Sequence, residues 1–311
     1  MAVYVNTNYS ALQGQRYLGN VQNSLTTTYQ RLSSGMRINS AKDDAAGLQI
    51  ADRLTSQING LNQGNRNASD GIALAQTAEA GMDEISGMLQ KIRTLAVQAA
   101  NGTNTADDKA ALSKEASALA NEITRIANQT TFAGKKILAG QQENTDTIFS
   151  KAATADKSKA GTITLQVGSN KGDTIAFQID NMKFSIASKR ADTNFKLDGA
   201  NDAVVEIKNN NIAFLFSKAD ASLVISHMDK MIADVDGLRA NLGAIQNRLE
   251  SSIRNQSNVA ANEADARSRI RDADFAEESA NLSQQSIIQQ AAASMLMQAN
   301  TRPQLGLSLL G

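Results

Sequence analysis

Hydrophobic side chains recur every three or four residues along most of the chain, which is the spacing of one face of an α-helix. The first series runs over residues 18–58 and the last over residues 275–299. Between them lie a long series over 48–95 with a returning series at 112–126, and a further series at 228–252. The pattern predicts a mainly α-helical chain whose two distant ends form two halves of one coiled coil.

The predicted helices are separated by short polar breaks. Ser33–Gly35 interrupts the first series, and Asp43 and Asp44 precede the second, where their carboxylates can cap a helix start. Asn101 and Gly102 mark a turn that makes the next helix antiparallel. Paired aspartates also serve acid–base chemistry, but no histidine or metal-ligand cluster accompanies these two, so capping and inter-subunit polar contact are favoured.

The middle of the chain has a different period. Between about 140 and 222, apolar residues alternate with polar ones at 163–167 and again at 175–179, with a turn at 168–172. A second candidate hairpin pairs 204–207 with 212–216 across 209–211, and residues 141–160 have loop composition. This region is predicted to be a small strand-rich insert.

The most regular heptad of the chain spans Met228 to Ser252, with steps of three and four and no slip. The predicted fold class is therefore mainly α: an elongated helical bundle or coiled coil from both chain ends, with a small β-hairpin-rich insert in the middle. The residues predicted to form the seam of the helical rod are Ile85, Ile92, Leu95, Leu119, Ile123, Val235, Leu238, Leu242, Ile245 and Leu249.

Composition narrows the class of protein. Aromatic residues make up only 4% and there is no Trp, which favours narrow helical seams over one thick core. There is no cysteine, so disulfides and thiolate sites are excluded. No apolar run is long enough to span a membrane, and no secretory signal is recognisable at the N-terminus. The formal net charge of +0 argues against a general nucleic-acid binder.

Charge is distributed unevenly between the two ends. Residues 1–42 carry four basic and no acidic side chains, whereas residues 272–311 carry four acidic side chains and Arg302. This asymmetry is either a chance feature of a solvated surface or an attraction between the two terminal helices.

The sequence contains little evidence for an enzyme active site. His227 is the only histidine, and its place at the start of the 228–252 heptad predicts a capping or surface role. There is no Gly-rich phosphate loop and no metal-ligand spacing. The chain is predicted not to be an enzyme, with no catalytic, metal-binding or cofactor-binding residue and no cofactor.

The terminal helices are predicted to need partners. A single amphipathic helix surrounded by water buries too little apolar surface to offset the entropy of ordering it. We therefore expect the ends to be disordered in the free monomer and ordered by neighbouring copies, and a head-to-tail contact that does not close gives an open fibre. The predicted terminal coiled-coil and inter-subunit residues are Leu18, Val21, Leu25, Arg31, Leu32, Arg37, Asp43, Asp44, Asp272, Asp274, Phe275, Leu282, Met295 and Leu296.

Two long motifs carry a family resemblance. The stretch LSSGMRINSAKDDAAG at 32–47, with VNTN at 5–8, resembles the N-terminal signature of bacterial flagellins. The stretch SRIRDADFAE at 268–277, followed by QQA at 289–291, Pro303 and LSLL at 307–310, resembles their C-terminal signature. Only about 140–222 falls outside the resemblance.

The resemblance implies a structural subunit that is exported unfolded by the flagellar type III route and polymerises into the extracellular filament used for swimming. Residues 1–44 with 268–311 would form the inner core, 45–180 with 223–267 an outer helical rod with a β-hairpin, and 181–222 a short variable, surface-exposed insert. The implied partners are further copies of the chain and the flagellar export chaperone, cap and junction proteins.

The family also has a stretch recognised by Toll-like receptor 5. The residues here that match it are Leu89, Gln90, Leu95 and Glu115, with Lys91 where an arginine is usual.

Two other functions remain as alternatives. A hook–filament junction protein shares flagellin-like ends and a similar length. A helical signalling bundle also uses heptads rich in Ala, Gln, Ser and Glu, but it should show unbroken helices and usually a membrane span.

Overall fold

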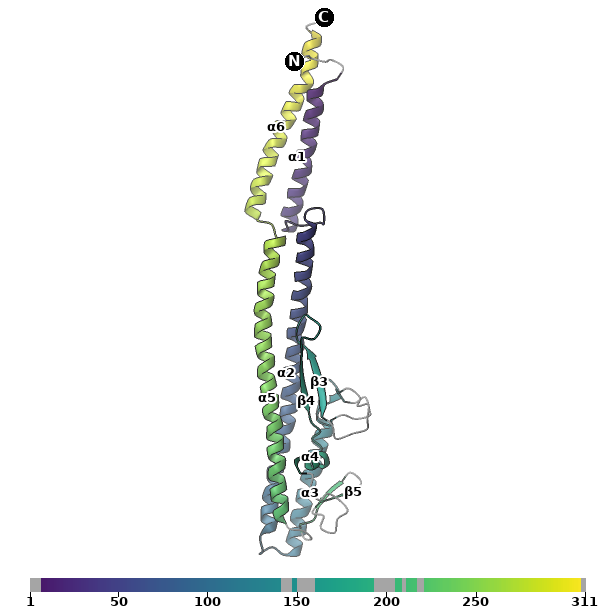
Figure 1. Cartoon of the computed structure of the whole chain (residues 1–311), viewed down its shortest axis with the longest axis vertical. Helices are drawn as coiled ribbons and strands as arrows, with labels where there is room; N and C mark the ends of the chain where they lie inside the picture. The colour runs from purple at the N-terminus through teal and green to yellow at the C-terminus, as the bar shows by residue number, and fades with distance from the viewer. Residues whose placement is uncertain are drawn as a thin grey trace. The chain divides into compact units, whose positions relative to one another are not determined.

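The computed structural model describes residues 7–140, 147–149, 160–192, 205–208, 211–216 and 221–308, without the side chains of 207, 208 and 302–308. The helices of the described chain are α1 (Tyr9–Ser34), α2 (Ala45–Ala100), α3 (Ala106–Gln129), α4 (Phe184–Ala191), α5 (Ala221–Arg271) and α6 (Phe275–Ser308), drawn in Figure 1. The strands form three antiparallel pairs: β1 (Thr131–Phe132) with β2 (Lys135–Lys136), β3 (Gly161–Gln166) with β4 (Thr174–Ile179), and β5 (Val205–Lys208) with β6 (Asn211–Phe214). The mainly α fold with a small strand-containing middle is confirmed.

The chain divides into two compact units. The terminal unit comprises residues 1–59 and 259–311, and the central unit comprises residues 60–258. These boundaries lie inside α2 and α5, whereas the family resemblance implied boundaries after residue 44 and before residue 268.

The central unit is built on antiparallel packing of α2 against α5. Side-chain contacts pair Asn65 with Ser257 and Arg93 with Asp229, so residue numbers rise along α2 as they fall along α5. The return helix α3 begins with a capping box in which the Thr105 side chain and the Asp108 carboxylate each bond the other residue's backbone N–H. The core between these helices is aliphatic and includes Met82, Ile85, Leu89, Ile92, Ile123, Met228, Val235 and Leu242.

The hairpin β3–β4 packs on α2, as Figure 1 shows. Its register runs from Gly161 opposite Ile179 to Gln166 opposite Thr174, so the predicted strands and the turn between them are confirmed. The hairpin approaches α2 closely at glycines: a Cβ added at Gly64 would lie 2.0 Å from the Val167 carbonyl oxygen. Glycine is needed there because its missing side chain leaves room for the neighbouring backbone.

The second hairpin is also present, with a shifted turn. Asn211 is paired with Lys208 at the start of β6, although it was predicted to lie in the turn. The predicted strand residue Val204 and the turn residues 209–210 lie outside the described residues, as does most of the predicted loop 141–160.

Two elements of the structure were not predicted. They are the eight-residue helix α4 and the small strand pair β1–β2, which follows α3 directly. The described part of 181–222 also contributes to the core: Met182 and Phe184 are fully buried, and Phe214 contacts the Phe184 ring edge-on at 5.8 Å between centroids. A region expected to be a surface-exposed insert therefore supplies aromatic residues to the interior, because α4 and β6 both pack against α3.

Candidate self-assembly interface

Helices α1 and α6 lie side by side and antiparallel in the terminal unit (Figure 1). Helix α1 begins at the N-cap Asn8, whose side chain accepts a hydrogen bond from the Ala11 N–H, and it ends at Gly35 with φ +69°. Its side turned to α6 follows the heptad spacing of a coiled coil. The residues of this stripe, all at least half-buried, are Ala11, Gly14, Leu18, Val21, Leu25, Thr28 and Leu32.

Polar contacts fix the register of the two helices. The Asn8 amide donates to the Ala299 carbonyl at 2.8 Å, and the Thr28 hydroxyl donates to Gln285 at 3.3 Å. Near the other end the Arg31 guanidinium donates to the Glu278 carboxylate at 2.9 Å, and the Glu278 side chain is only 8% exposed. The basic first helix and the acidic last helix are thus joined by an ion pair within one chain.

The two helix breaks are bonded to each other next to this pair. The backbone N–H of Arg37 donates to the Arg271 carbonyl at 2.7 Å, and the Ala273 N–H donates to the Gly35 carbonyl at 3.0 Å. The Arg37 guanidinium also donates to the Ile270 carbonyl at 2.7 Å. The predicted residue Arg37 therefore holds the break after α1 to the break before α6.

Of the paired aspartates, Asp44 caps the start of α2, as the sequence predicted, whereas Asp43 bonds the turn that precedes it. The Asp44 carboxylate accepts from the Gly47 N–H at 2.9 Å at the start of α2. The Asp43 carboxylate accepts from the N–H groups of Asn39 and Ser40, and these bonds lower the pKa of Asp43, with the Ser40 backbone contributing most. Both side chains stabilise the connection between α1 and α2.

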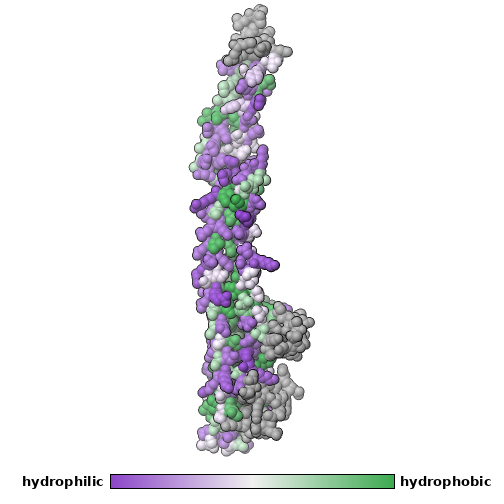
Figure 2. Space-filling model, viewed as in Figure 1, coloured by the Kyte–Doolittle hydropathy of each residue, from purple (hydrophilic) through white to green (hydrophobic). Residues whose placement is uncertain are grey.

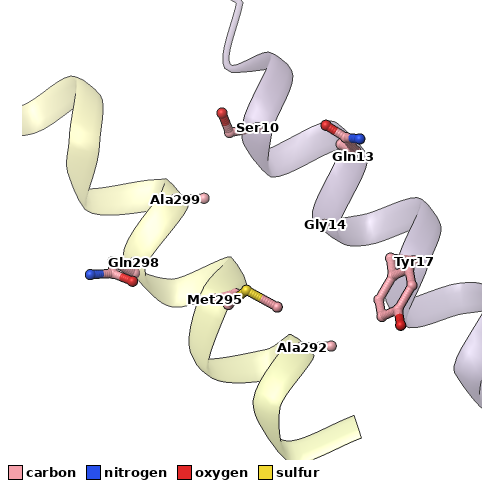
Figure 3. Close-up of a pocket in the computed structure, with 8 residues that line it drawn as sticks. All are labelled: Ser10, Gln13, Gly14, Tyr17, Ala292, Met295, Gln298 and Ala299. Carbon is pink, nitrogen blue, oxygen red and sulfur yellow. The ribbon is translucent and has the colours of Figure 1, made fainter. Parts of the chain in front are cut away.

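The α1–α6 seam contains an open cavity of about 390 Å³ near the chain ends. In Figure 3, Tyr17 on α1 and Met295 on α6 border it, and Ala292 and Ala299 face α1. Gly14 allows α6 to approach here, since its added Cβ would lie 3.1 Å from Leu296. Small residues at the seam leave an apolar hollow open to the outside.

Most of the exposed large hydrophobic side chains among the described residues lie in the terminal unit. Figure 2 shows hydrophobic patches among polar residues over the α1–α6 part of the chain. Among the described residues, the large hydrophobic side chains that are exposed outside the terminal unit are Val97 and Leu223. Those exposed inside it are Tyr9, Leu12, Tyr17, Tyr29, Ile50, Val259, Phe275, Ile287, Met295 and Met297.

The predicted terminal residues occupy different faces. Val21 and Leu25 are buried, Leu18, Leu32, Leu282 and Leu296 are half-buried, and Asp272 and Asp274 are exposed. The Asp274 carboxylate accepts from the Ala276 N–H at 2.8 Å at the start of α6, and Asp272 accepts from the Ser268 hydroxyl at 2.7 Å. Phe275 and Met295 are 59% and 60% exposed, so they lie on the outer side of the seam.

Sequence reasoning missed Glu278, Asn8 and Gln285 as contacts across this seam. Glu278 was counted only as part of the acidic end, although its heptad relation to Leu282 places it on the same helix face. The spacing of four residues between Glu278 and Leu282 was the sequence feature that could have predicted this contact.

The residues predicted for the rod seam lie along the contacts of α2, α3 and α5. Ile85, Ile92, Leu95, Ile123, Val235, Leu242 and Leu249 are buried, and Leu119, Leu238 and Ile245 are partly buried against the same core.

The residues matched to receptor recognition are split between surface and core. Gln90, Lys91 and Glu115 are exposed, with Lys91 Nζ 3.9 Å from the Glu115 carboxylate. Leu89 is 0% exposed and Leu95 is 4% exposed, so both side chains pack inside the helical core.

The interpretation of His227 as a capping or surface residue is wrong. It lies in the second turn of α5, is 1% exposed, and its Nε2 lies 2.7 Å from the hydroxyl of the fully buried Ser188. The heptad analysis began at Met228 and so did not include the first turns of α5, where α4 covers the helix.

Across the described ranges no group of three or more acidic or histidine side chains could hold a metal ion. Each helix within those ranges is too short or too polar to span a membrane.

Comparisons with known proteins agree with this geometry. Residues 5–143 match the bacterial flagellin N-terminal helical region, and residues 225–310 match the bacterial flagellin C-terminal helical region. Flagellin E of Vibrio cholerae is 36% identical over 376 residues, and polar flagellin C of Vibrio parahaemolyticus is 35% identical over 390 residues. Each alignment covers 100% of this chain and 100% of the relative.

Among solved structures, a putative flagellar hook-associated protein from Vibrio parahaemolyticus has a TM-score of 0.54 over 74% of this chain and 100% of that chain. At 16% identity this likeness concerns the fold alone.

Terminal helices that pair through a thin seam and turn apolar side chains outward are typical of a structural subunit that associates with other protein chains. The full-length matches then identify the particular family: this chain belongs to the bacterial flagellins. It is a structural subunit of the bacterial flagellar filament used for swimming, and neither the hook–filament junction protein nor the signalling bundle is favoured.

Proposed function

We propose that the outer apolar face of the paired helices α1 and α6 is the surface through which copies of this chain assemble. The observation that carries this proposal is the concentration of exposed large hydrophobic side chains in the terminal unit. Exposed apolar patches of this kind mark interaction sites, since their burial is favourable by about 25 cal/mol per Å². Tyr17 and Met295, which border the cavity, are positioned to receive a side chain from a neighbouring copy.

The same arrangement supports different positions in the filament for different segments of the chain. In our proposal residues 1–44 and 268–311 form the filament inner core, 45–180 and 223–267 the outer rod, and 181–222 a short variable insert. The break at Gly35 and the break at 272–274 support these boundaries, because the backbone bonds between them mark where the α1–α6 pair ends. The buried Phe184 and Phe214 limit the exposed part of the insert to its remaining residues.

We further propose that the chain is secreted through the flagellar export route and works outside the cell with the export chaperone, cap and junction proteins as partners. The family membership supports this. An innate-receptor contact with Toll-like receptor 5 is proposed only through Gln90, Lys91 and Glu115, since the Leu89 and Leu95 side chains are buried.

The chain is also proposed to have no catalytic activity. The Ser188 and His227 pair resembles a nucleophile and its base, but both residues are at most 1% exposed, so a substrate cannot reach the hydroxyl.

Seeded polymerisation tests the assembly surface. Purified chain is mixed with short filament seeds, and growth is followed by electron microscopy for the native chain, Met295→Ser and Leu223→Ser. The two replaced side chains are similarly exposed, at 60% and 57%, but only Met295 lies in the terminal unit.

We expect Met295→Ser to slow growth at least tenfold and Leu223→Ser to leave growth unchanged. Equal rates for the two variants would contradict the proposed surface. Short rings in place of fibres would favour a junction protein.

A further inference from the structure

Helix α4 and Asp192, the residue that follows it, are held on α5 by three polar contacts in the central unit. The Ser188 hydroxyl lies 2.7 Å from His227 Nε2, the Arg190 Nε donates to the Asp234 carboxylate at 2.8 Å, and Lys230 Nζ donates to Asp192 at 2.7 Å. The last two are at least partly exposed, whereas Ser188 and His227 are 0% and 1% exposed. The Ser188–His227 contact is therefore the one of the three that is shielded from water.

We propose that Ser188 and His227 form an acid-sensitive latch, which holds α4 on α5 in neutral solution and releases α4 in mild acid while α2, α3 and α5 stay folded. Every residue of the latch belongs to the central unit, whereas the proposed assembly surface belongs to the terminal unit, so the latch does not rest on that surface.

Protonation changes which hydrogen bonds the His227 ring can form. The neutral ring has one donor and one acceptor nitrogen, whereas the charged ring has two donors and no acceptor. A charged ring at this position would be buried with almost no contact with water, which is costly. Burial accordingly lowers the pKa of His227 from 6.5 to about 4.

The charged groups around the ring do not cancel this effect. Asp192, which follows α4, raises the pKa of His227, and Lys230 on α5 lowers it, with burial the larger cause. Asp192 is bonded to Lys230. The next charged groups are paired with each other: Arg190 with Asp234 and Asp180, and Arg93 on α2 with Asp229 on α5.

The sign of the pH dependence is set by these values. Because the folded pKa lies below the value of 6.5 for the released ring, the released state binds the proton more strongly. The closed latch is thus fully stable above pH 6.5 and is lost progressively as the pH falls toward 4. Between pH 7 and pH 5 the opening equilibrium should rise about 20-fold.

Hydrogen exchange on the full-length, unassembled chain measures this opening. Peptides covering α4 are compared with peptides from the middle of α3 at pH 7 and pH 5, after correction for intrinsic exchange rates. We expect the protection of α4 to fall about 20-fold relative to α3 in the native chain. In His227→Gln, which keeps a polar side chain but cannot titrate, the ratio should not change with pH.

Two results would overturn the latch: α4 protection that does not respond to pH in the native chain, or an equal response in His227→Gln. A second measurement needs no variant, because the chain has a single histidine. In a sample labelled at histidine, the imidazole resonance should titrate with a midpoint between about 4 and 6.5, because opening of the latch lets the ring bind its proton more readily, and a midpoint near 6.5 would refute the proposal.

Discussion

Glycines on α2 show how one residue type takes opposite roles in a single helix. An added Cβ at Gly64 would meet the Val167 carbonyl, whereas an added Cβ at Gly87 would meet nothing within 4 Å. Both lie in the helix interior, where glycine is less favourable than alanine by about 0.8–1 kcal/mol. The two glycines differ because the β3–β4 hairpin closely approaches Gly64 and does not approach Gly87.

We therefore expect the same substitution to have opposite signs at the two sites. Gly87→Ala should stabilise the chain by about 0.5–1 kcal/mol through reduced backbone freedom in the unfolded state. Gly64→Ala should destabilise it by about 1–3 kcal/mol, because β3 and β4 must move away from α2. Denaturant unfolding of the central unit measures both. Two changes of the same sign would show that the hairpin does not pack as described.

Arg31 and Glu278 give a second prediction at this scale. Reversing one charge, as in Arg31→Glu, places two carboxylates at a site where the Glu278 side chain is 8% exposed. The α1–α6 contact should weaken by about 1–3 kcal/mol. The double variant Arg31→Glu with Glu278→Arg should recover most of the loss, measured by filament melting temperature. Without any recovery the ion pair would have no role in pairing the helices.

Helices and strands could be predicted from the sequence where a single hydrophobic period persists along the whole element. The Met228 to Ser252 heptad lies wholly within α5, and the alternation at 163–167 and 175–179 gave the β3–β4 hairpin. Helix α4 spans about two turns, too few to establish a period. Its position is decided by contacts with distant residues, such as Ser188 with His227, and a local pattern holds no information about those.

The docking of β6 on α3 is another arrangement that a local pattern does not contain. Ser113 and Ser117 on α3 accept hydrogen bonds from the Phe216 and Phe214 N–H groups at 3.0 and 2.8 Å. One turn further on, Asn121 accepts from the Ile212 N–H at 2.9 Å and donates to the Ile212 carbonyl at 3.3 Å. The helix thereby satisfies one edge of a two-stranded sheet, which would otherwise expose unpaired backbone groups.

These hydrogen bonds between residues 212–216 and α3 form a ladder, and removing one of them should destabilise the folded chain. Ser117→Ala leaves the N–H of the buried Phe214 without its acceptor, and we expect a loss of about 1–3 kcal/mol in the free energy of unfolding. Thr124→Ala is the matched control, since that hydroxyl bonds only the Ala120 carbonyl of its own helix. Similar losses for the two variants, measured by urea unfolding, would argue against the ladder.

At the scale of the whole molecule, apolar burial is distributed unevenly. The larger buried cluster lies entirely within residues 74–242, and the smaller one joins Ala68 and Leu249 to Val167. In the terminal unit the seam between α1 and α6 includes Gly14, Ala292 and Ala299 and has room for a cavity. The sequence predicted that the ends pair, but it did not predict how little the pairing buries, because that depends on which side of each helix faces its partner.

This distribution predicts two levels of stability in the dissolved chain. Amides of α1 and α6 should exchange within seconds at neutral pH, while amides of α2, α3 and α5 at the central cluster should be protected by several kcal/mol. On polymerisation the terminal amides should become at least 100-fold slower, since neighbouring copies cover Tyr17, Ile287 and Met297. Exchange of the same preparation before and after seeding measures the change. Strong protection of α1 before seeding would mean that the pair is stable alone and that assembly does not complete its folding.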